Sequence, residues 1–370
     1  MEIKRNILLN PGPATTTNSV KYSQVVPDIC PREREFSAIM ARIRKDLVKI
    51  VKGDEDYTSI LFTGSGTAVM DAVISSVVPP GKKIAIVNNG AYGERMVKIA
   101  RAYRIPFVEI AFKWGTMPDL EKMEKTLKKD RAIDCLAMVH HETTTGMLNP
   151  LKEAGVVAAR NDVVFIVDTI SSFAGIPIDI KNRGIDFIFS TSNKCIQGMA
   201  GISFVICRRK ALDSIQDYPP RSFYLNLYQQ YDYFEKCGQM RFTPPVQVVY
   251  ALRQAIKEYF EEGVDNRYER YTKSWQALRK GLREMGFTFL LKENEESHIL
   301  TTVIEPDNPN YDFETMHDLL YKRGFTIYPG KIGKKGTFRL ANMGAIDRKD
   351  INNFLHALKE VLFEMKVKLS

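Results

Sequence analysis

The sequence predicts an α/β protein in which a mostly parallel, seven-stranded sheet flanked by helices precedes a smaller C-terminal α+β domain. From residue 58 onward, short β-branched runs alternate with helical patterns, as in βαβ units. Beyond residue 285 this alternation gives way to short strands around one helix and an amphipathic closing helix. The length of 370 residues suits two domains or one large α/β unit.

The elements follow in order along the chain. A first helix is expected over residues 37–51, because Ile39, Ile43 and Leu47 recur on one face. A later stripe that includes Tyr271 and Trp275 predicts a long helix ending near residue 285. The seven strands are expected at 58–62, 83–87, 107–111, 135–140, 163–168, 186–191 and 202–207. The C-terminal part is expected to form strands at 288–304, 325–330 and 336–341, and helices at 313–323 and 348–365.

These patterns predict an N-terminal arm (1–20), a large domain (21–262) and a small domain (263–370). The sequence contains no internal repeat and no low-complexity linker. We therefore expect the two domains to lie rigidly against each other, with the ligand site in the cleft between them.

The composition excludes several classes of protein. Hydrophobic residues make up 44% and charged residues 26%, which excludes collagen, coiled coils and bulk disorder. The net charge of +9 (53 Lys and Arg minus 44 Asp and Glu) is spread over helices that also carry acids. This mixture argues against nucleic-acid binding, whereas the excess favours small anionic ligands.

Cysteine usage and hydropathy predict the compartment. Five cysteines without CxxC spacing indicate reduced thiols rather than disulfides or a metal site. No apolar run approaches the roughly 18 residues of a membrane span, and residues 7–9 are too few for a signal-peptide core. We therefore expect a cytoplasmic protein that does not enter a membrane.

A run of small residues, TGSGT at 63–67, lies between an expected strand and an expected helix. Small residues here let backbone amides and the positive end of the helix close on a phosphate. Ser65 and Thr67 can add hydroxyl donors on either side of Gly66. A plain tight turn is the alternative, because the lysine of a P-loop is missing.

Two charged residues follow buried strands. Asp168 ends the run VVFIVD, where open α/β sheets place ligands, and its carboxylate needs a cation such as Mg²⁺ or a protonated ring nitrogen. Lys194 lies among small, uncharged residues, so desolvation would lower its pKa and make it a nucleophile for a Schiff base. The alternative for any single lysine is surface solvation. A phosphate cup, a strand-end acid and a strand-end lysine together are what pyridoxal phosphate requires.

The order of these motifs resembles the class V aminotransferases of fold type I. The matching residues are SGT (65–67), NGAYG (89–93), HETTTG (141–146), Asp168 and Asn193-Lys194. Within that class, HETTTGMLNPL, SNKCIQGMAG, FTPP and IYPGK resemble the 2-aminoethylphosphonate:pyruvate transaminases, over nearly the whole chain. The resemblance implies conversion of 2-aminoethylphosphonate and pyruvate to phosphonoacetaldehyde and L-alanine. An alanine:glyoxylate or serine:pyruvate type aminotransferase is the alternative.

The resemblance also implies roles for matching residues. Lys194 would hold the cofactor and shuttle protons, Asp168 would pair with the pyridine nitrogen, and Tyr92 would stack on the ring unless it is a core aromatic. The other cofactor contacts would be Ser65, Gly66, Thr67, Thr143 or Thr144, and Asn193. Thr243 would reach the phosphate in a neighbouring subunit, which implies an obligate homodimer with active sites at the subunit interface.

Arg339 is the expected substrate-binding residue. It lies in the middle of the expected strand GTFRLA, and its planar guanidinium suits a carboxylate or phosphonate. A structural salt bridge is the alternative. His140 and His141 are expected to be satisfied within the fold, and Cys195 is not expected to act as a nucleophile. The segment CPREREF (30–36) departs from the resembling enzymes and bears on the choice of amino donor.

Overall fold

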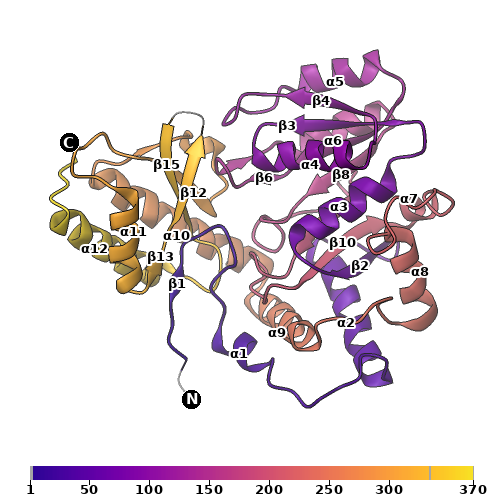
Figure 1. Ribbon diagram of the computed structural model, residues 1–370, viewed down its shortest axis with the longest axis horizontal. Helices are drawn as coiled ribbons and strands as arrows, with labels where there is room; N and C mark the ends of the chain where they lie inside the picture. Colours follow the sequence, from indigo (N-terminus) through magenta and orange to yellow (C-terminus); the bar gives the residue numbers. More distant parts are fainter. Residues whose placement is uncertain (1–2, 333–334, 370) are drawn as a thin grey trace.

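The chain forms two lobes, one around a large sheet and the other around a smaller sheet (Figure 1). This computed structural model describes residues 3–332 and 335–369. The first two residues of the expected arm and the last residue of the expected small domain lie outside the described residues.

The large sheet has seven strands in the order β2-β10-β9-β8-β5-β3-β4. β10 is antiparallel to its neighbours β2 and β9, whereas the remaining neighbours are parallel. The predicted fold class is confirmed, and every strand of this sheet lies within two residues of its expected bounds. The strands are β2 (Tyr57–Thr63), β3 (Lys83–Asn88), β4 (Phe107–Ala111), β5 (Ile133–Val139), β8 (Val164–Asp168), β9 (Phe187–Thr191) and β10 (Ile202–Arg208).

Helices pack against this sheet because parallel neighbours must be joined by crossover connections. The first long helix, α2 (Arg34–Ile50), buries the predicted face with Ile39, Ile43 and Leu47. These side chains join the sheet in one hydrophobic core. The other helices of this lobe are α3 (Gly66–Val77), α4 (Ala91–Ala102), α5 (Leu120–Lys129), α6 (Leu151–Arg160), α7 (Arg209–Asp213), α8 (Leu227–Cys237) and α9 (Val246–Glu262). A short hairpin, β6 (His141–Glu142) and β7 (Met147–Leu148), follows β5.

The smaller lobe contains a four-stranded antiparallel sheet in the order β11-β12-β15-β14. Its elements are α10 (Val264–Glu284), β11 (Thr288–Phe289), β12 (Leu300–Ile304), α11 (Phe313–Lys322), β13 (Phe325–Thr326), β14 (Tyr328–Ile332), β15 (Lys335–Ala341) and α12 (Arg348–Glu364). The expectation of strand throughout 288–304 is wrong in its middle. The polar run between β11 and β12 forms a 3₁₀ turn (Glu293–Glu295), because such a run has no apolar face to bury.

The N-terminal arm crosses between the lobes (Figure 1). Its strand β1 (Ile7–Leu8) pairs in parallel with β13, and Ile7 and Leu9 enter the core of the smaller lobe. The arm then reaches the large lobe, where the amide of Ala14 donates to the carbonyl of Asn193 at 2.9 Å. It ends in the short helix α1 (Asn18–Tyr22). Within the described residues, no helix is long and apolar enough to cross a membrane.

Candidate active site

Lys194 and Asp168 line the same narrow cleft. Asp168 comes from the carboxyl end of β8, and Lys194 from the turn after β9, the next strand in the sheet. Tyr92, His141, Thr143 and Ser171 complete the polar part of the lining. The parallel sheet thus brings together side chains that lie far apart in the sequence.

Asp168 has one carboxylate oxygen satisfied and the other free. Its Oδ1 accepts a hydrogen bond from the amide of Ile170 at 2.7 Å, whereas Oδ2 is buried without a partner among the described residues. Burial raises the pKa of this carboxyl to about 7. The described residues contain no group of three His, Cys, Asp or Glu side chains that could hold a metal ion. Oδ2 therefore fits a protonated ring nitrogen better than Mg²⁺.

Lys194 is held by the N-terminal arm. Its Nζ donates to the carbonyl oxygen of Pro11 at 2.5 Å. Gly12 has a φ of +121°, and a Cβ at that position would overlap the lysine side chain, so the close approach requires glycine. Burial lowers the pKa of Lys194 to about 8, against the opposing attraction of Asp168. The neutral amine needed for attack on an aldehyde is therefore well populated near neutral pH.

This lowered pKa predicts how cofactor uptake depends on pH. A Schiff base at Lys194 would form only from the neutral amine, so the rate at which cofactor-free protein takes up pyridoxal phosphate should rise about tenfold per pH unit below pH 8 and level off above it. Stopped-flow absorbance between pH 7 and pH 10 measures this rate. A midpoint near 10, as for an exposed lysine, would contradict the prediction. Lys194→Ala protein controls for non-covalent uptake.

The residues 65–67 form a cup at the N-terminus of α3. Ser65 is the N-cap residue, yet its side chain makes no capping hydrogen bond, which leaves the hydroxyl for a ligand. A Cβ on Gly66 would lie 2.8 Å from Cδ1 of Ile170, so a larger residue there would displace the Ile170 side chain, which lines the cleft. The free amides and the positive helix end are suited to phosphate.

Glu142 is a residue of the site that sequence reasoning missed. Its buried carboxylate accepts hydrogen bonds from the amide of Tyr92 at 3.2 Å and from the hydroxyl of Thr144 at 2.6 Å. Glu142, on strand β6, therefore caps the N-terminus of α4, because the N-cap residue Gly90 has no side chain that could do so. A Cβ on Gly90 would overlap this carboxylate. Thr144 is thus engaged with Glu142, whereas Thr143 lines the cleft.

Arg339 lies on β15 and has no carboxylate partner among the described residues. Its Nη1 donates to the carbonyl of Thr143 at 3.2 Å and its Nη2 to the carbonyl of Pro329 at 3.1 Å. Its Nε is buried without a partner. The alternative of a structural salt bridge is therefore wrong for the described part of the chain. A guanidinium bonded only to carbonyls retains its full charge for an anion.

Asn193 and Thr243 are not among the residues that line the cleft. Oδ1 of Asn193 accepts a hydrogen bond from the hydroxyl of Thr191 at 3.1 Å. Thr243 is exposed and lies just before α9. The geometry of one chain thus brings Lys194, Asp168, Tyr92 and Thr143 together without these two residues.

The two histidines and Cys195 are satisfied within the fold, as expected. Nδ1 of His140 lies 3.0 Å from Oγ of Ser172, and His141 bridges the hydroxyls of Ser171 and Ser297. Burial lowers the pKa of both rings to about 3, so both are neutral. Burial also raises the pKa of the Cys195 thiol to about 12, which leaves no thiolate for attack.

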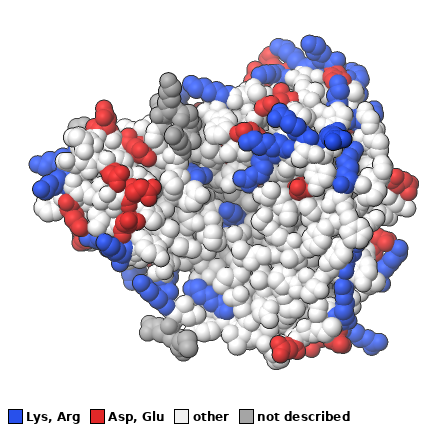
Figure 2. Space-filling view, viewed as in Figure 1, with Lys and Arg blue, Asp and Glu red and all other residues white. Residues whose placement is uncertain are grey.

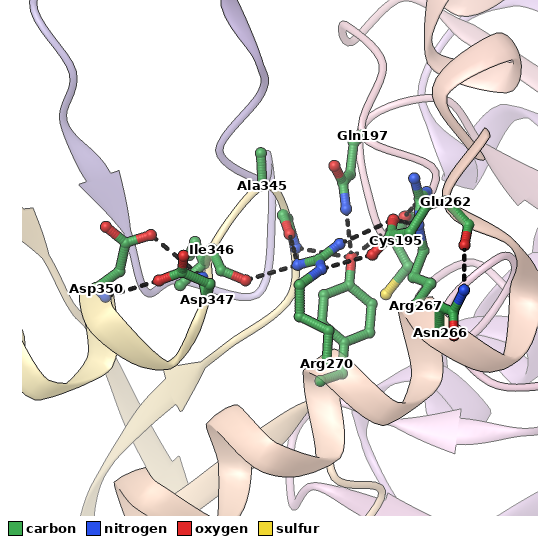
Figure 3. A network of polar contacts seen from close by, with 12 residues as sticks. Cys195, Gln197, Glu262, Asn266, Arg267, Arg270, Ala345, Ile346, Asp347 and Asp350 are labelled. Carbon is green, nitrogen blue, oxygen red and sulfur yellow. Dashed lines mark hydrogen bonds and ion pairs between the residues drawn. The ribbon is translucent and has the colours of Figure 1, made fainter.

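A polar network on α10 connects the turn that carries Lys194 to the smaller lobe (Figure 3). The buried side chain of Arg267 donates to the carbonyl of Cys195 at 3.1 Å. The hydroxyl of Tyr271 accepts from Nε2 of Gln197 at 2.7 Å and from the amide of Gly344 at 3.0 Å. Arg270 donates to the carbonyl of Ile346 at 2.6 Å. One helix therefore fixes the turn carrying Lys194 relative to the lobe carrying Arg339.

Basic side chains also mark the surface around the site. Figure 2 shows blue Lys and Arg side chains within the hollow between the two lobes. Arg339 and Arg95 both lower the pKa of Lys194 through their charge, so both lie within electrostatic range of it. The site is therefore suited to anions.

The comparison with family models agrees with this geometry. A model described as Aminotransferase class-V matches residues 17–351. The fold and the site define a pyridoxal-phosphate-dependent enzyme of fold type I, with a strand-end aspartate, a strand-end lysine and a phosphate cup. The chain belongs to the class V aminotransferases.

Curated relatives and solved structures extend this result. A relative from Salmonella paratyphi C is named 2-aminoethylphosphonate--pyruvate transaminase; it is 40% identical over 99% of this chain and 100% of its own length. A relative of the same name from Syntrophobacter fumaroxidans is 40% identical over 96% of each chain. The structure is similar to an alanine--glyoxylate aminotransferase from Nostoc sp., with a TM-score of 0.90 and 27% identity over 98% of this chain and 96% of that one. It shares the fold of a ureidoglycine-glyoxylate aminotransferase from Bacillus subtilis, with a TM-score of 0.91 and 24% identity over 100% of this chain and 96% of that one.

Proposed function

We propose that this aminotransferase converts 2-aminoethylphosphonate and pyruvate to phosphonoacetaldehyde and L-alanine. The observation that carries the proposal is Arg339, a guanidinium beside the Lys194 cleft without a carboxylate partner among the described residues. Both substrates are anions with the reacting carbon close to the charged group. The names of relatives that match nearly the whole chain support this choice of substrates.

The residues described above fit pyridoxal phosphate. We propose that Asp168 Oδ2 pairs with the ring nitrogen, because this buried oxygen has no other partner among the described residues. We further propose that Ser65, Gly66, Thr67 and Asn193 hold the phosphate, that Tyr92 stacks on the ring, and that Thr143 rather than Thr144 contacts the phenolic oxygen. When bound, the cofactor supplies an aldehyde for the amino group and a ring that withdraws electrons from the adjacent carbon.

Within this site Lys194 is the proton carrier. Its Nζ removes a proton from the amine-bearing carbon of the substrate and later returns one, for which a pKa near 8 is well matched to neutral pH. The carbonyl of Pro11 provides a resting partner for the free amine. Arg339 binds the phosphonate of the donor in one half of the cycle and the carboxylate of pyruvate in the other.

We also propose that the protein is a homodimer in which Thr243 serves the site of the partner. Exposed aromatic side chains near Thr243 support an interface, because aromatic residues are enriched at interfaces. Phe223 is 77% exposed and Tyr224 is 40% exposed, and Tyr224 stacks on Phe242, the residue before Thr243. Arg32 anchors the loop before Thr243 through the carbonyl of Met240. Arg32 belongs to the segment 30–36, so this segment would also lie near the partner's site and influence the choice of donor.

Two further expectations stay proposals. We propose a large domain over 21–262 and a small domain over 263–370, supported by separate hydrophobic cores in the two lobes. The arm over 1–20 would belong to both, since β1 pairs with β13. We propose a cytoplasmic location, which the five unpaired cysteines support.

A screen of amino donors tests the proposed reaction. Holoenzyme is mixed with 2-aminoethylphosphonate, alanine or serine in single-turnover experiments, and the loss of cofactor aldehyde absorbance is followed. We expect 2-aminoethylphosphonate to react with the highest kcat/KM, and pyruvate to restore the absorbance with formation of alanine. Equal or faster reaction with serine would favour the alternative, a serine:pyruvate or alanine:glyoxylate type enzyme, for which the similarity to the Nostoc enzyme provides a reason.

A further inference from the structure

Arg95 joins the two parts of the site that face the cofactor. It lies one turn into α4, and its Nη1 donates to Oγ1 of Thr67 in the phosphate cup at 3.2 Å. Its guanidinium carbon also lies 4.7 Å from the centre of the Tyr92 ring. No motif of the sequence distinguishes this arginine from the others.

The charge of Arg95 has no acidic partner among the described residues. Its helix neighbour Lys98 pairs with Glu94 at 2.7 Å, whereas the recorded contacts of Arg95 are the Thr67 hydroxyl and the Tyr92 ring. The side chain of Arg95 is only partly exposed. Arg95 and Arg339 both lie within electrostatic range of a third cation, Lys194. The nearest acids, Asp168 and Glu142, have pKa values that burial raises, so they offset these three charges poorly and an entering anion would be stabilised.

The contact with Thr67 shows where that anion would sit. A hydroxyl that accepts a hydrogen bond from a guanidinium has its own proton free to donate to a neighbouring acceptor. Four of the five N–H groups of Arg95 remain for further acceptors, and a planar guanidinium suits the oxygens of a phosphate. The cup at the start of α3 already offers backbone amides to the same group.

We propose that Arg95 is a positioning residue for the cofactor phosphate, which it holds both through the Thr67 hydroxyl and with its own N–H groups. This rests on pyridoxal phosphate as the cofactor and not on the identity of the amine. The cation above Tyr92 additionally keeps that ring in place for stacking. Recognition of the cofactor therefore depends on a charge in α4 as well as on the cup in α3.

The test compares pyridoxal phosphate with pyridoxal, which has the same ring and aldehyde but no phosphate. Dissociation constants are measured by absorbance on cofactor-free parent protein and on Arg95→Met, without any amine substrate. We expect Arg95→Met to weaken binding of pyridoxal phosphate about 10- to 100-fold and binding of pyridoxal by less than about threefold. Internal hemiacetal formation weakens pyridoxal equally in both proteins, so the ratio between proteins cancels it.

Two further variants make the result decisive. Lys98→Met removes a positive charge from the same helix at an exposed position and should leave both constants unchanged. Arg95→Lys keeps the charge and should recover most of the preference for the phosphorylated form. Equal losses for both ligands, or no loss for either, would overturn the proposal. Since no amine is present, these outcomes are independent of the donor screen.

Discussion

Replacing Lys194 with alanine should lower kcat by about 10³-fold or more, because positioned acid–base groups contribute factors of about 10² to 10⁴ and the proposed role of this residue also includes attaching the cofactor. The measurement is pyruvate-dependent formation of alanine by holoenzyme. The side chain lies beside Asp168 and is held by Pro11, so its Nζ is the amine placed for proton transfer in this cleft.

A loss of activity alone would not separate catalysis from support of the fold. Lys210→Ala, an exposed lysine on α7, should retain the parent rate. Methylamine, a small base that fits the space left by the lysine chain, should restore part of the rate of Lys194→Ala. A kcat within tenfold of the parent, or activity lost beyond any rescue together with an altered circular dichroism spectrum, would remove Lys194 from the proposed role.

Replacing Arg339 with methionine should lower kcat/KM for both 2-aminoethylphosphonate and pyruvate by about 10²-fold. The guanidinium makes hydrogen bonds to two carbonyls and leaves Nε unpaired, so a substrate anion would be its first charged partner. The kcat/KM values of Arg339→Lys should lie between those of the parent and those of Arg339→Met, because lysine keeps the charge but lacks the planar guanidinium.

Two controls isolate the charge interaction. Propylamine has the chain length of 2-aminoethylphosphonate without the phosphonate, so its slow reaction should be the same in Arg339→Met and in the parent. Arg323 lies on the surface of the same lobe, where it pairs with Glu364. Arg323→Met removes this cation and should not change kcat/KM for 2-aminoethylphosphonate or for pyruvate. An equal loss for propylamine would mean that Arg339 supports the fold of the site rather than the anion.

The large sheet could be predicted because each of its strands is a short apolar run between turn-forming residues. Asp168 and Lys194 could be selected for the same reason: they are charged residues at the ends of such runs. Pattern alone also explains the wrong prediction at 288–304, because it does not separate the polar stretch between β11 and β12 from the two strands themselves. The split of 325–330 into β13 and β14 is a related case, because β13 pairs with the distant β1.

Glu142, Arg95 and Tyr271 could not be found in this way. Glu142 caps a helix through the amide of Tyr92, 50 positions earlier, and Arg95 on α4 contacts Thr67 on α3. Periodicity predicts Tyr271 in a core stripe, and the residue is buried, yet its hydroxyl joins the turn that carries Lys194 to the smaller lobe. Such roles depend on contacts between distant segments, for which periodicity carries no signal.

The contact between the N-terminal arm and Lys194 forms late relative to the synthesis of the arm itself. Pro11 and Lys194 are separated by 183 positions, and β1 can pair with β13 only after that distant strand has been synthesised. Contacts of such long range form slowly because much of the chain must first be confined. Residues 7–11 thus reach their places long after their own synthesis, so we expect Lys194 to gain its resting partner only after β13 has been made.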